Sequence, residues 1–439
     1  MRVLPILICC VAVGQTQRVL PVSLKRAVEI ALTPEGSPKV AIAEETIQQA
    51  EMRRIESRGD LLPDLESSVN DQRETENLHA FGFNFKIPIA GFAFPTIVGP
   101  FSVFDARATA SQTVLDFAAI DRYKASKVNV AAAKADFDAT RNQVSDQIAR
   151  AYLACLRADA TLELAHSNVE LSEALVKQAQ QVKEAGTGTG IDVTRNQSQL
   201  ANDRQHLVVA TNDRRRAGLN LLRAMGLNLA TDVQLTDKLD YRPADIGTLE
   251  AALAEAKSLR AELRAQKERE ASARLTYNAA KFARLPSIGA SANYGTIGSA
   301  LIGAQPTYDY GFSVRVPVFN GGKTDAQKYE RMSEYRQEQT RTRDVEDQVE
   351  LDVRLAFESV SSAVAEIDAA NEGMTLAENE LAQARRRYQA GVADAIEVTD
   401  AQTRLDRAHD NRIAALYDYN LARIDLATAT GRIGEYVNQ

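Results

Sequence analysis

The sequence predicts a mainly α-helical protein with a small β part, built from two tandem copies of one structural unit. The first observation is a turn that occurs twice: Val182–Arg195 reads V-K-E-A-G-T-G-T-G-I-D-V-T-R, and Tyr388–Asp400 reads Y-Q-A-G-V-A-D-A-I-E-V-T-D. Each turn contains glycine and interrupts two long helical patterns, which is typical of the tip of a helical hairpin. The second observation is a Leu-Pro pair that precedes an alternating apolar and polar segment in each copy, at Leu62-Pro63 and at Leu285-Pro286.

Composition and charge narrow the class of protein. The 439 residues include no Trp, and glycine and proline occur in clusters, as expected when long helices dominate. The formal net charge of -7 argues against a nucleic-acid-binding protein, because neutralising phosphates requires a basic face. Beyond the N-terminus no segment has about 18 uninterrupted apolar residues, so any insertion into a membrane is expected to use strands.

The N-terminal segment resembles a secretory signal peptide. An apolar run, Val3–Val13, precedes the small residue Gly14, and cleavage there would remove residues 1–14. Two alternatives stay open: the apolar N-terminus of a cytosolic protein, including a wrongly assigned start, and a lipoprotein signal with Cys10 as the acylated residue. Without this segment only Cys155 remains, and we expect it to be a packed thiol. No disulfide framework or Cys-based metal site can then be built.

The first copy covers residues 15–227 and begins with two short helices. The first, Ser23–Leu32, starts with a capping Ser and has one apolar face. The second runs from about residue 40 to residue 58. A strand pair follows at about 65–115, and its connection, Phe81–Phe101, is expected to be an apolar hairpin loop because it contains several prolines and glycines. A helical hairpin at about 116–226 completes the copy, and its first helix of roughly seventy residues would measure about 100 Å.

The second copy covers residues 228–439 and repeats this order. One helix is predicted from about Asp245 to Arg284, then a strand pair at about 287–319 and a helical hairpin at about 320–431. The motif that opens this last hairpin, V-P-V-F-N-G-G, ends at Gly322.

Both hairpins carry a seven-residue repeat of apolar side chains, which indicates coiled-coil packing. In the second copy the repeat includes Ile367, Met374 and Leu381. Alanine fills another set of positions with the same spacing: Ala210, Ala217 and Ala224 in the first copy, and Ala370, Ala377, Ala384, Ala408, Ala415, Ala422 and Ala429 in the second. Small residues at such positions allow the helices to approach closely.

The strands alternate apolar and polar residues. Tyr308, Tyr310 and Phe312 alternate with polar residues such as Asp309, which is typical of a transmembrane strand with Tyr at the lipid interface. A strand of a soluble sandwich has the same pattern, but too few partner strands are visible. About four strands cannot close a barrel, and an open edge in lipid leaves backbone groups unsatisfied. Three subunits would supply about twelve strands, so the sequence predicts a barrel shared within a trimer.

No catalytic or metal-binding set of residues is apparent. The histidines His79, His166, His206 and His409 are isolated and lack a spacing that suits a metal. The G-T-G-T-G segment at 186–190 follows a helix instead of a strand and lacks the Gly-Lys-Ser/Thr ending of a phosphate-binding loop. No nucleophile, base and orienting group can be assembled, so the chain is predicted to be no enzyme and to hold no cofactor.

In their order and duplication these motifs resemble the TolC family of outer-membrane efflux proteins. The resemblance implies a homotrimer with a twelve-stranded barrel in the outer membrane and a long α-helical tunnel across the periplasm, entered at the hairpin tips. It implies an exit duct of a tripartite efflux pump or a type I secretion system. The implied partners are a periplasmic adaptor protein and an inner-membrane transporter of the RND, ABC or MFS type.

The resemblance also implies which acidic residues form the constriction. Two acids of the family's second tip face the channel axis, and they fall on Glu397 and Asp400. Three-fold symmetry would gather about six carboxylates in one ring, which attracts cations. The alternative is that both are solvated acids at a helix start, where the helix dipole favours them.

A latch is implied in the same way. In the family a Tyr before the second tip bonds to an Asp in the first tip, and these fall on Tyr388 and Asp192. The family's Arg within the second tip is Ala393 here. One polar latch is therefore missing or is supplied by another group, such as Arg195 or Asp394. The long first connection, Phe81–Phe101, is expected to form an enlarged extracellular loop or plug.

The predicted function is a passive exit channel. The alternative from another class is a soluble coiled-coil scaffold or tethering protein without channel activity, for which the seven-residue repeats alone would suffice. The two strand pairs and the N-terminal signal favour the channel.

Overall fold

The computed structural model describes residues 20–33, 35–80, 82, 96–186, 188–243, 247–393 and 395–438. The chain divides into two compact units, and each unit combines segments from both halves of the sequence. Unit 1 comprises Met1–Glu45, Ala135–Arg264 and Asp344–Gln439, and unit 2 comprises Thr46–Lys134 and Ala265–Arg343. The predicted signal segment with Cys10, and most of the predicted loop Phe81–Phe101, lie outside the described residues.

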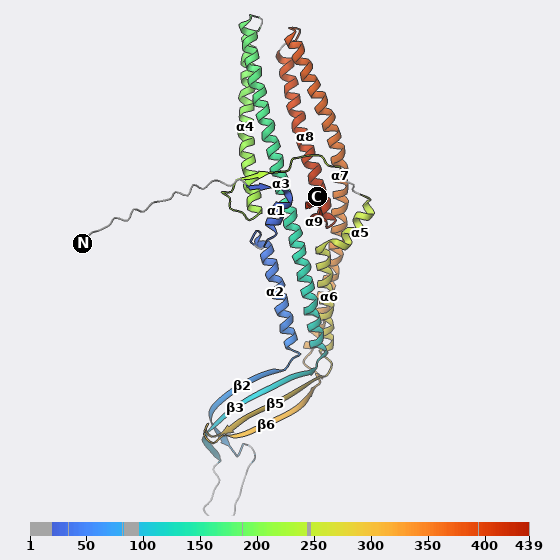
Figure 1. Cartoon of the computed structure of the whole chain (residues 1–439). Helices are drawn as coiled ribbons and strands as arrows, with labels where there is room; N and C mark the ends of the chain where they lie inside the picture. The colour runs from blue at the N-terminus through green and yellow to red at the C-terminus, as the bar shows by residue number, and fades with distance from the viewer. Residues whose placement is uncertain are drawn as a thin grey trace, which may run out of the picture. The chain divides into compact units, whose positions relative to one another are not determined.

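Helices make up most of the described chain (Figure 1). They are α1 (Leu24–Ala31), α2 (Pro38–Gly59), α3 (Phe117–Glu184), α4 (Gly190–Ala224), α5 (Leu249–Leu259), α6 (Ala261–Phe282), α7 (Lys323–Gln389), α8 (Ala395–Ala429) and α9 (Ile433–Val437). The strands are β1 (Leu20–Val22), β2 (Asp64–Asn77), β3 (Ile97–Leu115), β4 (Val233–Leu235), β5 (Ser287–Gly298) and β6 (Gln305–Arg315). Within the described ranges, no helix combines the length and the apolar character needed to cross a membrane.

Unit 2 contains a four-stranded antiparallel sheet in the order β2-β3-β5-β6 (Figure 1). On one face the register places Tyr308 opposite Tyr294, and Tyr294 opposite Ala108. On the other face it aligns Asp309 with Asn293, whose side-chain amide donates a hydrogen bond to the Asp309 carboxylate. The predicted alternation of an apolar and a polar face is therefore confirmed.

The described residues leave the apolar face of this sheet uncovered. Tyr308, Tyr310 and Phe312 of β6 are 70%, 79% and 81% exposed. Contiguous apolar surface of this kind marks a contact with lipid or with another protein. The sheet thus presents a surface that the single chain does not bury.

The strands differ from the sequence prediction in two respects. β6 ends at Arg315 and not near residue 319, because Pro317 has no N–H group to give to a strand ladder. The parallel pair β1 and β4, in which Leu20 lies opposite Val233, is absent from the prediction. Each of these strands has three residues, which is too few to display a period of two.

Unit 1 contains α4 and α8 with the parts of α3 and α7 that pair with them, residues 135–184 and 344–389 (Figure 1). The predicted seven-residue repeat of α7 is buried: Ile367, Met374 and Leu381 are only 2%, 6% and 5% exposed. Facing residues of α8 form a cluster with Ile367, namely Ala415, Tyr419 and Ala422. The predicted coiled-coil packing of this hairpin is confirmed.

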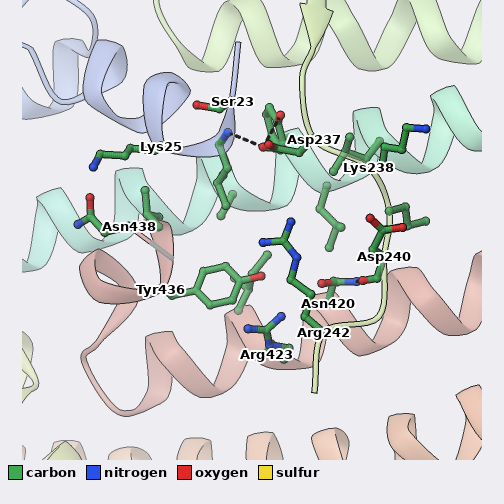
Figure 2. A pocket seen from close by; sticks show the side chains of 18 of the residues that line it. Ser23, Lys25, Asp237, Lys238, Asp240, Arg242, Asn420, Arg423, Tyr436 and Asn438 are labelled. Atoms are coloured by element: carbon green, nitrogen blue, oxygen red, sulfur yellow. Dashed lines mark hydrogen bonds between the residues drawn. The ribbon is translucent and has the colours of Figure 1, made fainter. Parts of the chain in front are cut away.

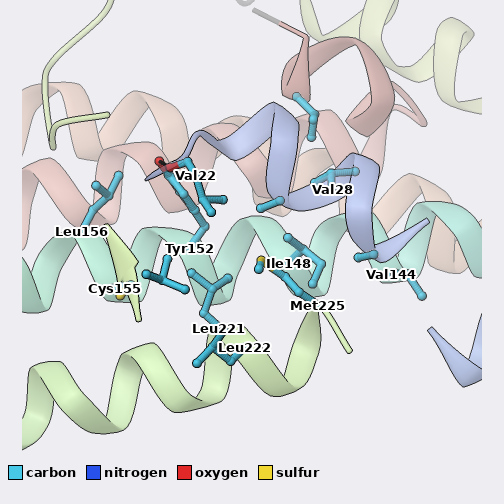
Figure 3. Close-up of a cluster of buried hydrophobic side chains, with 14 of the residues drawn as sticks. Val22, Val28, Val144, Ile148, Tyr152, Cys155, Leu156, Leu221, Leu222 and Met225 are labelled. Atoms are coloured by element: carbon cyan, nitrogen blue, oxygen red, sulfur yellow. Dashed lines mark hydrogen bonds between the residues drawn. The ribbon is translucent and has the colours of Figure 1, made fainter. Parts of the chain in front are cut away.

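Figure 3 shows a cluster of buried side chains contributed by α1, α3 and α4, among them Val28, Ile148 and Leu221. Cys155 belongs to this cluster and is 1% exposed. Burial raises the pKa of the Cys155 thiol to about 11. The prediction of a packed thiol is confirmed.

The single helix predicted from about Asp245 to Arg284 is wrong, because the chain forms α5 and α6 with a break at Arg260. The Arg260 backbone is extended, with ψ of 115°. Its side chain is only 13% exposed, and Nη2 lies 3.2 Å from Asp352 Oδ2. Nη1 also donates to the backbone oxygen of Ala429 at 3.3 Å. A poorly exposed guanidinium needs such partners, so these long-range contacts override the local helical pattern.

Ser23 caps α1 as predicted, with its hydroxyl oxygen accepting the N–H of Arg26 at 3.3 Å. Replacing Ser23 by Ala is expected to lower the free energy of unfolding by about 1 kcal/mol, because that N–H loses its partner. Denaturant unfolding of the purified protein, followed by circular dichroism, measures this loss. Ser258→Ala is the control, since the Ser258 hydroxyl donates to Glu255 within α5 and caps nothing. An equal loss in both variants would contradict the capping role.

Candidate functional site at the hairpin tips

The first hairpin tip joins α3 to α4 and fixes the carboxylate of Asp192. Gly186 has φ of 79°, a left-handed conformation that favours glycine. The Thr189 hydroxyl oxygen accepts the N–H of Asp192 at 3.3 Å, and the Thr189 N–H points back to Asp192 Oδ2 at 3.4 Å. This reciprocal pair is a capping box. Arg195 adds an ion pair to Asp192 at 3.6 Å, so Asp192 is held by its own tip.

The second hairpin tip joins α7 to α8 through a Schellman turn. Gly391 has φ of 71° and donates its N–H to the Tyr388 oxygen at 3.0 Å. The next N–H, that of Val392, reaches the Arg387 oxygen at 3.1 Å. Together these bonds satisfy the last carbonyls of α7, so Arg387 and Tyr388 occupy the final helical turn. Ala393 follows in the turn, and Asp394 lies outside the described residues.

Glu397 and Asp400 lie one turn apart near the start of α8, between the buried Ala395 and the buried Ala401 in the sequence. Asp400 is exposed. Glu397 pairs across the turn with Arg387, whose Nε lies 2.9 Å from Glu397 Oε1. Sequence reasoning missed this pair. The run of three arginines before the tip was the available signal, but the turn geometry decides which of them reaches Glu397.

Tyr388 lies half-buried beside Leu381, Ala384 and Val398 of the second hairpin. Burial, and next the negative charge of Asp192, raise the pKa of the Tyr388 hydroxyl. The charge of Asp192 therefore acts on the Tyr388 hydroxyl, and the described residues show no hydrogen bond between the two members of the expected latch.

A buried polar network farther from the tips is a feature that sequence reasoning missed. Gln402 of α8 donates to the Ser172 hydroxyl of α3 at 3.2 Å, and Ser172 donates to the Asp203 carboxylate of α4. The three residues are 1%, 1% and 4% exposed, respectively. A signal existed in the repeat, because Ser172 stands seven residues before the buried Ala179, and Asp203 seven before the buried Ala210. Polar residues at such seam positions specify how helices pair.

Asp406 lies one helical turn beyond Gln402 on α8, next to this network. Its Oδ1 is buried and has no hydrogen-bond partner among the described residues. Burial, then the charges of Asp203 and Asp410, raise the pKa of the Asp406 carboxyl to about 6. All three acids line a cavity of about 400 Å³ formed by α3, α4 and α8, together with His206 and Arg407. Asp406 therefore changes charge close to neutral pH.

Figure 2 shows a second cavity of unit 1, of about 450 Å³. Asp237 at its wall accepts the N–H of Leu24 at 3.0 Å and the hydroxyl of Tyr152 at 2.7 Å. Burial and this carboxylate raise the pKa of Tyr152. Arg423 lies over the ring of Tyr436, 5.2 Å from its centroid. These groups stabilise the packing of the surrounding elements.

Within the described ranges, no group of three or more His, Cys, Asp or Glu side chains is placed to hold a metal ion.

Comparison with known proteins gives the chain its family. The family model described as "Outer membrane efflux protein" matches residues 30–227 and 252–432. The chain belongs to the outer membrane efflux protein family. The two matched segments cover both helical hairpins and both strand pairs of the chain.

Curated relatives of this efflux protein are moderately similar to it. The chain is 23% identical over 310 residues to outer membrane protein TolC of Vibrio cholerae serotype O1, covering 69% of this chain and 71% of that protein. It is 26% identical over 340 residues to alkaline protease secretion protein AprF of Pseudomonas aeruginosa, covering 74% of this chain and 69% of that protein.

Solved structures share the fold. The outer membrane protein VceC of Vibrio cholerae aligns with a TM-score of 0.79 at 18% identity, covering 93% of this chain and 96% of that chain. The MtrE outer membrane channel of Neisseria gonorrhoeae, solved in an open state, aligns with a TM-score of 0.76 at 19% identity, covering 93% and 88%.

Membership of the outer membrane efflux protein family confirms the predicted resemblance to the TolC family. It also confirms the predicted location, the outer membrane, with the helical part in the periplasm. The alternative of a soluble scaffold is not favoured.

Proposed function

We propose that this efflux protein is the outer-membrane exit channel of a tripartite efflux pump or a type I secretion system and conducts substrates passively. The observation that carries the proposal is the uncovered apolar face of the four-stranded sheet. Its outer strands, β2 and β6, have edges that no other described strand pairs, and lipid cannot satisfy such edges. Three copies in a homotrimer would join them into a twelve-stranded barrel.

The organisation of the chain in this proposal follows the sequence prediction. Residues 1–14 are a signal peptide, and residues 15–227 and 228–439 are tandem repeats, each contributing one strand pair and one helical hairpin. The partners are a periplasmic adaptor protein and an inner-membrane transporter of the RND, ABC or MFS type. The relative AprF carries protease secretion in its name, which supports the secretion role beside the efflux role.

The hairpin tips form the gate in this proposal. Glu397 and Asp400 lie at the constriction, where three subunits would gather about six carboxylates. The exposure of Asp400 and the turn-spacing of the two acids support this role. Tyr388 and Asp192 form the latch, which the electrostatic interaction between them supports.

The proposed function is tested with purified protein in a planar lipid bilayer and with a strain that lacks the gene. We expect a homotrimer that forms a stable, cation-preferring channel of low resting conductance. Loss of the gene should raise sensitivity to exported compounds if the chain serves an efflux pump, and abolish secretion of a protein if it serves type I secretion. A silent bilayer, with unchanged sensitivity and unchanged secretion in the deletion strain, would contradict the channel.

A further inference from the structure

A continuous chain of hydrogen bonds links the two hairpins of unit 1. Gln402 Nε2 of the second hairpin donates to Ser172 Oγ of the first at 3.2 Å. Ser172 Oγ donates in turn to Asp203 Oδ2, and Asp203 Oδ1 accepts the side-chain amide of Gln199 at 3.0 Å. Every link after Gln402 lies within the first hairpin, so the bond between Gln402 and Ser172 is the link of this network that joins the hairpins. Farther from the tips, Asp425 of α8 also pairs with Arg150 of α3.

The network differs from the ion pairs that hold each hairpin together. Arg204 and Glu173 join α4 to α3 at 2.7 Å, with side chains 60% and 51% exposed. Arg387 and Glu397 join α7 to α8 with side chains 57% and 40% exposed. Solvent screens such pairs, and each contributes little to stability. The bond between the hairpins is buried and is therefore far more sensitive to separation of its partners.

The network lies between an apolar contact and a polar cavity. Leu175, one turn from Ser172 on α3, packs against Leu381, Ala384 and Val398 of the second hairpin, and Asp203 lines the cavity of about 400 Å³. If the hairpins move apart there, the Gln402 amide loses its buried acceptor. A buried donor without a partner is costly, so the network favours the arrangement in which the hairpins are together.

We propose that Ser172, Asp203 and Gln402 are gating residues, and that opening of the channel requires the Gln402–Ser172 bond to break. The inference rests on the proposed function, because opening here means separation of the hairpins near their tips. Gln402 lies about two turns into α8, which starts at Ala395. The network is thus a second restraint on the closed state, set back from the tip interaction of Tyr388 with Asp192.

The experiment measures the opening of single channels in a planar bilayer for two variants. Ser172→Ala leaves both the Gln402 amide and Asp203 Oδ2 without a partner, and the ratio of open to closed time is expected to rise about tenfold. Gln402→Met keeps the side-chain volume and leaves only a lone pair of Ser172 unsatisfied. Its expected rise is smaller, about threefold.

Matched controls separate gating from a general loss of stability. Ser167→Ala on α3 and Gln383→Met on α7 make the same chemical changes at exposed positions and are expected to leave the ratio unchanged. If circular dichroism shows that Ser172→Ala does not fold, Gln402→Met still tests the gating role of the Gln402–Ser172 bond. If the wild-type protein forms channels and a folded Ser172→Ala or Gln402→Met variant has the same ratio of open to closed time, the gating role of this bond is overturned and the proposed function is not. A wild-type protein that forms no channel would overturn the proposed function and, with it, the gating role of the bond.

Discussion

Replacing Glu397 by Gln and Asp400 by Asn together is expected to turn the channel from cation-preferring to anion-preferring. From residue 386 to residue 400 the second tip carries two arginines, Arg386 and Arg387, and three acids, Asp394, Glu397 and Asp400, so the local charge is +2 - 3 = -1. The double variant has a charge of +2 - 1 = +1 over the same residues, and a trimer would change from -3 to +3. Since the sign of a charged ring decides which ions a constriction concentrates, the preference reverses and is not merely lost.

The reversal potential across a bilayer with a salt gradient measures this change. We expect the cation-to-anion permeability ratio to fall by about tenfold or more, the scale on which charged clefts concentrate ions. Glu380→Gln is the matched control, because Glu380 pairs with Arg404 within the same hairpin but lies farther from the tip. Arg387→Gln should raise cation preference. Unchanged selectivity in the double variant would exclude these residues from the constriction.

The helix seams and the strand faces could be predicted from the sequence. In each of them, residues at a regular spacing share one environment, so the same type of side chain recurs at that spacing. A buried seam is indicated by the spacing of Ile367, Met374 and Leu381. An apolar face is indicated by the alternating Tyr residues of β6. Both patterns follow from helix and strand geometry alone. The same local geometry gave the capping role of Ser23.

Features that depend on long-range partners could not be predicted in this way. Arg260 breaks a helix because Asp352 and a carbonyl of α8 accept its guanidinium. Gln402 has no distinctive local pattern, and its role depends on Ser172 in the other half of the chain. A candidate site made of such pairs becomes visible only when the tertiary arrangement is known.

Asp406 is expected to make the closed arrangement of the hairpins more stable in mild acid than at pH 7.5. Burial and the charges of Asp203 and Asp410 raise its pKa from the usual 3.8 to about 6. The folded protein therefore binds a proton at Asp406 between about pH 4 and 6 that the unfolded chain has released, and the free energy of unfolding rises as the pH falls through this window. Ionised Asp406 faces the carboxylates of Asp203 and Asp410, with His206 and Arg407 on the same cavity wall.

Asp406→Asn isolates this contribution, because the amide keeps the shape and carries no charge. At pH 7.5 the variant should be more stable than the wild type by on the order of 1 kcal/mol per subunit, a value reduced from the full pKa shift because the side chain retains some access to solvent. At pH 5, in the middle of this window, the difference should fall to about half, because the folded wild type holds the proton that the unfolded chain has already released. Thermal unfolding of the protein in detergent at both pH values measures it, with Asp418→Asn as the control at an exposed position of α8. The titration of His206 is common to wild type and variant, so a gain that is equal at pH 5 and pH 7.5 would assign the pH dependence to groups other than Asp406.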